Sequence, residues 1–160
     1  MGADNQQERL NTQWVAGFVD GEGCFHVAIN KMPKMSLGWQ VLPEFRVVQH
    51  KRDMEILHRI RDTLGCGKVT RNHEDRFEVR VRGMQDLKKV IAFFEENKLQ
   101  TTKRKNFEIF AKIITMMKNK KHLTKEGLGK IARMVSTMNQ KVKPAYLESP
   151  ETLRQMSRLR

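Results

Sequence analysis

The sequence lacks the cysteine pattern of a disulfide scaffold or a structural zinc site. Its 160 residues include only two cysteines, Cys24 and Cys66, which stand far apart and form no CxxC pair. Secreted cystine frameworks and zinc sites need more cysteines at closer spacing, so we expect neither. A chain of this length can bury a hydrophobic core without cross-links, and we expect reduced thiols in one compact domain.

Long hydrophobic runs are also missing. The first ten residues, MGADNQQERL, contain no apolar segment of the kind found in secretory signals. No later stretch approaches the roughly 18 uninterrupted apolar residues that a membrane-spanning helix requires. We therefore expect a soluble intracellular protein, in the cytoplasm or an organelle matrix, that is not secreted and has no membrane partner.

Acidic residues are scarce relative to basic ones. Lys and Arg total 31 against 18 Asp and Glu, which gives a formal net charge of +13. Such an excess favours an extended polyanion as the partner. Nucleic acid is favoured over a membrane surface because no single basic amphipathic helix carries the charge. A charged surface that only maintains solubility is the alternative interpretation.

Hydrophobic periodicity predicts an alternation of helices and paired strands. Apolar residues recur at helical spacing in residues 10–19, 54–64 and 84–97. They alternate with polar residues in the strand segments 25–29, 41–47 and 77–81, with a further strand from Val69. Helix, two strands, helix, two strands and helix, joined through hairpins, indicate an α+β fold with one twisted antiparallel sheet.

Local signals predict where these elements begin and end. Gly21 and Gly23 are expected to end the first helix, and Asp53 to cap the second. The remaining chain predicts helices only, at residues 103–118 and 124–140 and in a short segment after Pro150. We therefore expect an α+β core in residues 1–100 and a helical C-terminal part of the same domain in residues 101–160.

The segment WVAGFVDGEGCF, residues 14–25, combines small residues with two acids. Ala16, Gly17 and Gly21 indicate a helix surface kept small so that a second helix can approach closely. Asp20 and Glu22 are disfavoured where the helix ends, because the helix dipole is negative there and carbonyls are unpaired. A divalent cation would reverse that penalty. The alternative is that both acids are solvated residues of a glycine-rich turn.

The sequence WVAGFVDGEG closely resembles the LAGLIDADG signature, and specifically its LAGFVDGEG variant. Proteins with this signature are homing endonucleases and related intron maturases. The resemblance extends to the order of elements, which matches the αββαββα core of that family. It implies a β-sheet saddle that binds DNA, an intron-encoded origin and hydrolysis that leaves a 5′-phosphate and a 3′-hydroxyl. Because the motif occurs once here, the resemblance implies a homodimer.

The resemblance also implies site residues. Glu22 would bind Mg²⁺, Mn²⁺ or another divalent cation, with the carbonyl of Gly21 as a neighbouring ligand. Asp20 falls on the more structural acid of the signature, and the dimer interface would consist of Ala16, Gly17, Asp20 and Gly21. Gln49 takes the place of a glutamine that supports metal-bound water. Lys103 is the best match for a basic residue beside the scissile phosphate, although Arg104 or Lys105 could be in register instead.

The two hairpins would lie in the DNA major groove, where alternate side chains read base edges. A strand of about nine residues spans about 30 Å, hence roughly nine base pairs per half-site. Some of these charges could instead only solvate a half-covered sheet. The expected DNA-facing residues are His26, Ala28, Asn30, Lys34, Gln40, Leu42, Glu44, Arg46, Lys68, Thr70, Asn72, Arg76, Glu78, Arg80 and Arg82.

Taken together, these observations predict a metal-dependent, site-specific endonuclease that cuts a long pseudo-palindromic duplex as a homodimer. An RNA-binding intron maturase, or a DNA-binding regulator that does not cut, would have the same fold and is the alternative. Glu22 favours cleavage, because purely binding descendants of the family often lack this acid.

Overall fold

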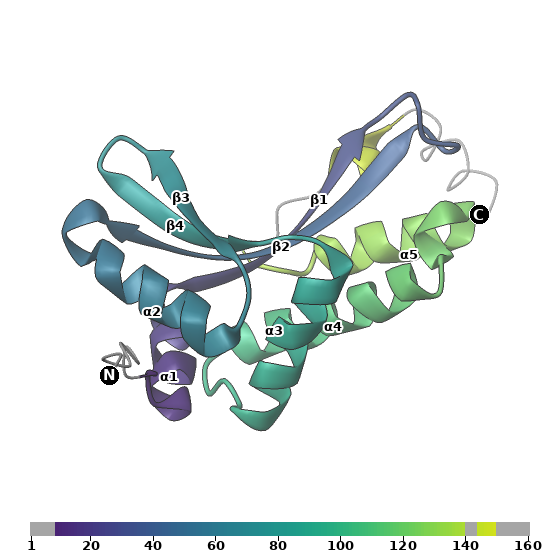
Figure 1. Cartoon of the computed structure of the whole chain (residues 1–160). Helices are drawn as coiled ribbons and strands as arrows, with labels where there is room; N and C mark the ends of the chain where they lie inside the picture. The colour runs from purple at the N-terminus through teal and green to yellow at the C-terminus, as the bar shows by residue number, and fades with distance from the viewer. Residues whose placement is uncertain (1–8, 140–143, 150–160) are drawn as a thin grey trace, which may run out of the picture. The chain divides into compact units, whose positions relative to one another are not determined.

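The computed structural model describes residues 9–139 and 144–149, which form helices and a four-stranded antiparallel sheet (Figure 1). The strands are hydrogen-bonded in the order β1-β2-β4-β3. This confirms the predicted α+β fold class. The elements are α1 Thr12–Glu22, β1 Gly23–Lys31, β2 Trp39–His50, η1 Lys51–Asp53, α2 Met54–Leu64, β3 Lys68–His73, β4 Arg76–Val81, α3 Met84–Glu96, α4 Lys103–Lys118, η2 Lys121–Leu123, α5 Lys125–Val135 and η3 Ala145–Glu148.

The described residues group into two compact units. The first unit comprises residues 9–24 and 44–104, and the second comprises residues 25–43, 105–139 and 144–149. Strand β2 contributes residues to both units. Residues 25–43, which belong to the first hairpin, therefore group with the C-terminal helices.

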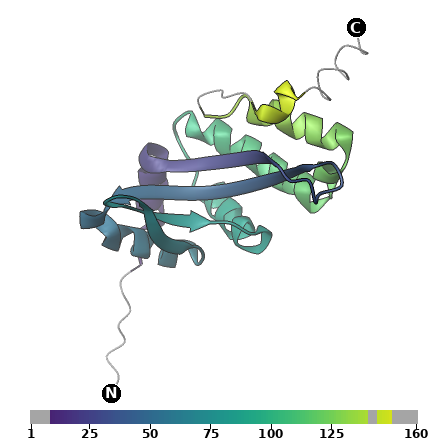
Figure 2. The same ribbon diagram turned by 90° about the horizontal axis from the view of Figure 1, so that it is seen from above.

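In the first unit, helices lie on one face of the strands. Figure 1 shows α1, α2 and α3 on the same side of β4 and β3, and in Figure 2 these helices lie behind the strands. No described helix of this unit lies on the opposite face. The buried face of the strands carries Phe45, Val47, Val79 and Val81, and the Phe45 ring lies 5.7 Å from that of Phe94 in α3. One face is thus core and the other is open, as the alternation predicts.

Helix α1 begins at a side-chain cap and ends at a glycine. The Asn11 carboxamide oxygen accepts hydrogen bonds from the backbone N–H groups of Gln13 and Trp14. We expected both glycines to end the helix, but the helix continues through Gly21 and ends at Glu22. Gly23 is the required residue, because a Cβ there would lie 2.6 Å from the Val19 side chain.

Helix α2 differs from the prediction at its start. Asp53 occupies the N-cap position but makes no side-chain capping hydrogen bond, and it is also the last residue of a short 3₁₀ turn, Lys51–Asp53. The predicted end is confirmed: Gly65 follows with φ of 75°, a left-handed conformation that glycine adopts without a steric penalty.

The second unit has an aromatic core. The Phe25 ring of β1 lies 5.3 Å from that of Phe107 and 5.4 Å from that of Phe110, both in α4. Helix α5 begins at a Thr124 cap and ends at Val135, five residues before the predicted end at residue 140. The segment predicted as a short helix after Pro150 lies outside the described residues. Within the described part of the chain, no helix has the length and apolar character needed to cross a membrane.

Candidate active site and nucleic-acid interface

The last turn of α1 carries two carboxylates with different surroundings. The Asp20 side chain is half-buried, whereas Glu22 is exposed. Both belong to the first unit, as do Gln49 and Lys103. The carbonyl groups of a helix's last turn have no partners within the helix, so this end of α1 is rich in oxygen acceptors.

The Asp20 carboxylate holds the segment that precedes α4. Its oxygens accept hydrogen bonds from the Gln100 N–H at 2.7 Å, the Thr101 N–H at 3.1 Å and the Thr101 hydroxyl at 2.7 Å. Burial by itself would raise the pKa of Asp20, but these hydrogen bonds and the charge of Lys103 outweigh it, so the pKa lies below its usual value. Asp20 therefore acts as an ionised tether between α1 and the start of α4.

Lys103 lies beside the same helix end. Its ammonium group donates a hydrogen bond of 3.0 Å to the carbonyl oxygen of Val19. Burial lowers the pKa of Lys103, and the nearby Cys24, Asp20 and Glu22 offset part of that shift. Arg104 and Lys105 are exposed. Among the residues of the first unit, the structure therefore brings the Lys103 amine to the two acids.

Gln49 completes the cluster from the end of β2. Its amide nitrogen lies 3.4 Å from a carboxylate oxygen of Glu22, a long hydrogen bond. The cluster therefore contains an exposed carboxylate, an amide and an amine, contributed by α1, β2 and the first turn of α4. We call Glu22, Gln49 and Lys103 the α1-end cluster.

Glu22 is the side chain at this position that fits a divalent cation. Hard cations such as Mg²⁺ prefer carboxylate and carbonyl oxygens, and Mg²⁺ usually retains waters and contacts substrate phosphate. The Asp20 oxygens are already occupied by Gln100 and Thr101. Among residues 9–139 and 144–149, no three His, Cys, Asp or Glu side chains form a metal-binding group. One chain thus offers Glu22, with helix-end carbonyls such as that of Gly21, rather than a complete set of protein ligands.

One side of α1 is open. A Cβ added at Gly17 or Gly21 would meet nothing within 4 Å. Trp14 is 45% exposed, and its ring stacks on that of Phe18 at 5.0 Å. Residues 14, 17, 18 and 21 follow helical spacing and therefore share one stripe.

The open stripe of α1 lacks two residues of the expected interface, Ala16 and Asp20, and contains two others. The Asp20 carboxylate is engaged by Gln100 and Thr101 within the chain. Ala16 is only 3% exposed within the chain, so it belongs to the buried side of the helix with Val15 and Val19. Sequence reasoning did not include Trp14 and Phe18 in the expected interface and identified them only as apolar positions of the helix. Their spacing of three or four residues from Gly17 and Gly21 is the signal that could have identified them.

The open face of the strands in the first unit carries basic side chains in register. Arg46 of β2 pairs with Arg80 of β4, which in turn pairs with Lys68 of β3, so three cations form one row across the strands. We call this surface the arginine face. It consists of Arg46, Lys68, Thr70, Asn72, Arg76, Arg80 and Arg82, with Glu44 and Glu78 among them.

Two residues expected to face DNA are buried instead. Glu78 is 0% exposed and Glu44 is 6% exposed, although both lie on the open side of their strands. They are covered because arginines of the same face fold over them: Arg80 pairs with Glu78, and Arg82 pairs with Glu44. In this structure both carboxylates are therefore engaged by arginines, and direct base contact by either glutamate stays a prediction.

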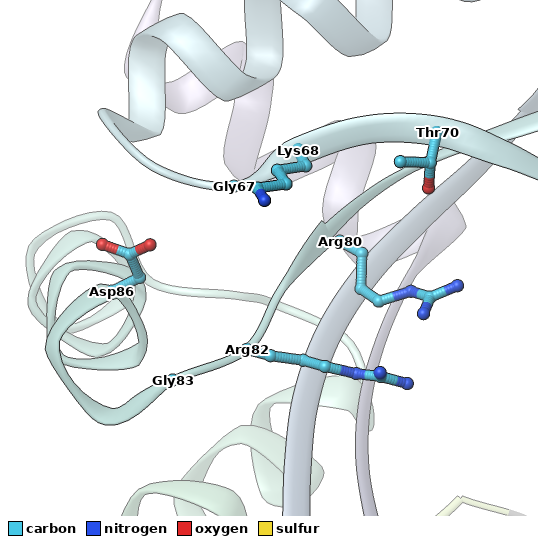
Figure 3. A pocket seen from close by; sticks show the side chains of 7 residues that line it. All are labelled: Gly67, Lys68, Thr70, Arg80, Arg82, Gly83 and Asp86. Carbon is cyan, nitrogen blue, oxygen red and sulfur yellow. The ribbon is translucent and has the colours of Figure 1, made fainter.

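The arginine face includes a pocket at its β3–β4 end. The pocket has a volume of about 470 Å³ and is shown in Figure 3. Arg80 in β4 and Arg82, which directly follows β4, extend in the same direction, and Lys68 and Thr70 come from β3. Its lining residues are Gly67, Lys68, Thr70, Arg80, Arg82, Gly83 and Asp86.

The expected DNA-facing residues of the second unit alternate as predicted. In β1, His26 and Ala28 are half-buried and Asn30 is exposed, whereas Phe25, Val27 and Ile29 between them are buried. Gln40 and Leu42 in β2 follow the same alternation, and Lys34 is exposed in the turn between the two strands. The predicted phase of these strands is confirmed.

A family model and curated relatives match most of this sequence. A model of the LAGLIDADG endonuclease family matches residues 15–114. Probable intron-encoded endonuclease 3 of Neurospora crassa is 30% identical over 137 residues, which are 84% of this chain and 26% of that protein. The chain spans about a quarter of the length of the first curated relatives that it matches.

Solved structures of homing endonucleases are also similar to this chain, in sequence and in fold. The homing endonuclease I-TnaI is 47% identical, with a TM-score of 0.84 over 92% of this chain and 99% of that chain. The LAGLIDADG meganuclease I-CpaMI, solved bound to uncleaved DNA, is 31% identical, with a TM-score of 0.84 over 92% of this chain and 50% of that chain. The resemblance therefore covers sequence and fold over nearly the whole chain.

Proposed function

This chain belongs to the LAGLIDADG endonuclease family, and on that premise we propose that it is a site-specific DNA endonuclease that acts as a homodimer. The observation that carries the proposal is the α1-end cluster. An exposed carboxylate and a partly buried amine lie together where α1 ends. These are the groups that phosphodiester hydrolysis needs for cation binding and for charge stabilisation.

Homodimerisation is supported by the open stripe of α1. Gly17 and Gly21 leave space that a second α1 can enter, and packed helices come within 8–10 Å when their contact residues are small. This chain covers half of the DNA-bound I-CpaMI chain, so two copies would supply a comparable length. A twofold axis through paired α1 helices would bring the two Glu22 carboxylates side by side and give the target a pseudo-palindromic form.

We propose that a divalent cation binds at Glu22. When bound, the cation would supply Lewis-acid polarisation of the phosphate and an activated water nucleophile. Because one chain offers an incomplete ligand set, the partner chain's carboxylate and the DNA phosphate would share the coordination. The backbone carbonyl of Gly21, the residue before Glu22, would provide a further oxygen ligand.

The other residues of the cluster have separate tasks. The Lys103 ammonium, held by the Val19 carbonyl, would stabilise negative charge on the phosphate during cleavage. The Gln49 amide would orient water and the Glu22 carboxylate through its hydrogen bond. Asp20 would keep Lys103 in place, because its tether to Thr101 ends two residues before the lysine.

We propose that the arginine face and the alternating residues of the first hairpin bind the major groove. The row of Arg46, Arg80 and Lys68 supplies positive charge for phosphates and donors for base edges. To test the proposal, the purified protein is incubated with a random duplex library and the cut ends are sequenced. Cleavage at one defined sequence, only with Mg²⁺ or Mn²⁺ present, supports the proposal.

Two outcomes would contradict this proposal. Selection of a duplex sequence without cleavage under any divalent cation would favour a DNA-binding regulator with the same fold. Preference for structured RNA over every duplex would favour an intron maturase.

A further inference from the structure

Two carboxylates are buried within a surface that otherwise carries positive charge. Glu78 and Glu44 are the buried acidic residues among the described residues of the chain. A buried carboxylate is unfavourable unless hydrogen bonds and opposite charge compensate for its lost hydration. The partners of each glutamate therefore indicate why it is present.

The carboxylate of each glutamate forms an ion pair with an arginine. One Glu78 oxygen accepts from Arg80 through Nε and also pairs with its Nη2, and the other accepts from the Asn72 amide at 2.7 Å. One Glu44 oxygen lies 2.7 Å from both Nε and Nη2 of Arg82, the residue that directly follows β4. The other Glu44 oxygen lies 3.7 Å from Nη1 of Arg46. The glutamates thus have no free oxygen edge directed at a ligand.

Both arginines use the same edge of the guanidinium group. In Arg80 and in Arg82 the edge formed by Nε and Nη2 is directed at a carboxylate. The end formed by Nη1 and Nη2 retains donors outside these contacts. This is the end that binds guanine through two parallel hydrogen bonds to O6 and N7. Figure 3 shows both side chains extending in the same direction.

The two carboxylates have an electrostatic cost for DNA binding. Each one cancels a positive charge on a surface that would attract phosphate more strongly without it. A surface that only needed general affinity for DNA would gain from neutral residues at these positions. Ordering of the arginines is the compensating benefit, because a guanidinium held in one orientation loses less entropy when it binds a base.

We propose that Glu78 and Glu44 are positioning residues that hold Arg80 and Arg82 in the orientation for reading guanine. They lower general attraction to DNA and raise discrimination between sequences. The inference rests on the proposed DNA-binding function and adds the specificity device of that surface. It assigns the base contacts to the arginines and the orientation to the glutamates.

The test uses the full-length protein with Glu78→Gln. The wild-type protein first selects a preferred duplex from a random library, and affinities are then measured for that duplex and for a scrambled duplex of equal composition. We expect the ratio of the two affinities to fall roughly tenfold, as for loss of one bidentate base contact. Affinity for the scrambled duplex should stay equal or rise, because a negative charge has been removed.

Glu74→Gln is the matched control. Glu74 lies in the turn between β3 and β4, is exposed, and carries the same charge. The Glu74→Gln variant should also bind the scrambled duplex with equal or higher affinity. The ratio of its affinities for the selected and the scrambled duplex should equal that of the wild-type protein. Glu44→Gln provides a second test through Arg82 if Glu78→Gln does not fold.

Three results separate the interpretations. Parallel loss of affinity for both duplexes would indicate a purely structural role and overturn the inference. An unchanged ratio in both Glu78→Gln and Glu44→Gln would overturn it as well. If the wild-type protein selects no duplex at all, the proposed DNA-binding function fails, and the inference fails with it.

Discussion

The two acids of α1, Asp20 and Glu22, are separated by one residue and have different partners. Asp20 accepts three hydrogen bonds from Gln100 and Thr101, whereas Glu22 is exposed and has the Gln49 amide at 3.4 Å. Chemical type alone does not distinguish them. Their different environments make Asp20 the tether and leave the Glu22 carboxylate exposed, as the proposed cation site requires.

Glu22→Gln should abolish cleavage and retain DNA binding. The amide has the same shape as the carboxylate but lacks the anionic oxygen that a hard cation prefers. We expect a rate decrease of at least about 100-fold, comparable to loss of one major electrostatic contribution. Cleavage of the selected duplex and its binding in Ca²⁺ would be measured in parallel.

The matched control for that variant is Glu96→Gln. Glu96 is the last residue of α3, as Glu22 is of α1, and it is also exposed in the first unit. The Glu96→Gln variant should cleave the selected duplex at the wild-type rate. Full cleavage by the Glu22→Gln homodimer would move the active site elsewhere.

The protonation state of Lys103 should affect the pH dependence of the cleavage rate. Because burial lowers its pKa, the amine loses its proton at a lower pH than an exposed lysine does. If the charged form stabilises the transition state, the single-turnover rate should fall on the alkaline side as pH rises through that lowered pKa. Lys103→Arg should cut more slowly at neutral pH but lose this alkaline decrease, since arginine stays protonated. An identical alkaline limb in both proteins would show that another group titrates.

At the scale of elements, α1 combines two surfaces. Val15, Ala16 and Val19 are buried, and the stripe of Trp14, Gly17, Phe18 and Gly21 is open. Aromatic rings beside glycines provide both apolar area and room for close approach. The same helix carries Glu22 at its end, so the proposed dimerisation would bring the two copies of Glu22 together.

Gly17→Leu should block dimerisation and with it double-strand cleavage. The side chain occupies the space that a second α1 would enter, while leucine is favoured over glycine in a helix by up to about 1 kcal/mol, so folding should be retained. Sedimentation should detect a folded monomer. Thr12→Leu adds the same side chain at an exposed position of α1 off the open stripe and should remain a dimer. An active Gly17→Leu monomer would refute an α1 interface.

At the scale of the whole molecule, charge should govern the proposed association with DNA. The formal net charge of +13 and the row of Arg46, Arg80 and Lys68 predict that log affinity falls linearly with log salt, through release of counterions from phosphates. Lys68→Gln should reduce the slope by about 0.9 if this amine contacts one phosphate. Titrations at several salt concentrations measure the slope.

Lys98→Gln is the control for the salt experiment. Lys98 is exposed, follows α3 and does not belong to the arginine face. Its slope should equal that of the wild-type protein. Equal slopes for Lys68→Gln and the wild type would exclude a phosphate contact by Lys68.

Much of this protein follows from local patterns in its sequence. The spacing of apolar residues predicts the helices at residues 54–64 and 103–118 and the phase of the strands, because helical and strand periodicities involve residues close in sequence. The signature around Glu22 indicates the family, and the basic composition favours a polyanionic partner. These properties require no knowledge of which distant residues meet.

Only the tertiary structure decided how the side chains are used. Asp20 is occupied because Gln100 and Thr101, far along the chain, are folded against the end of α1. Ala16 is buried, and Gly17 beside it is open. Glu44 is buried because Arg82, which follows β4 and is distant in sequence, covers it. The physical reason is common to all three: hydrogen bonding and desolvation depend on neighbours in space, and a periodic pattern assigns a residue to a face without specifying what covers it.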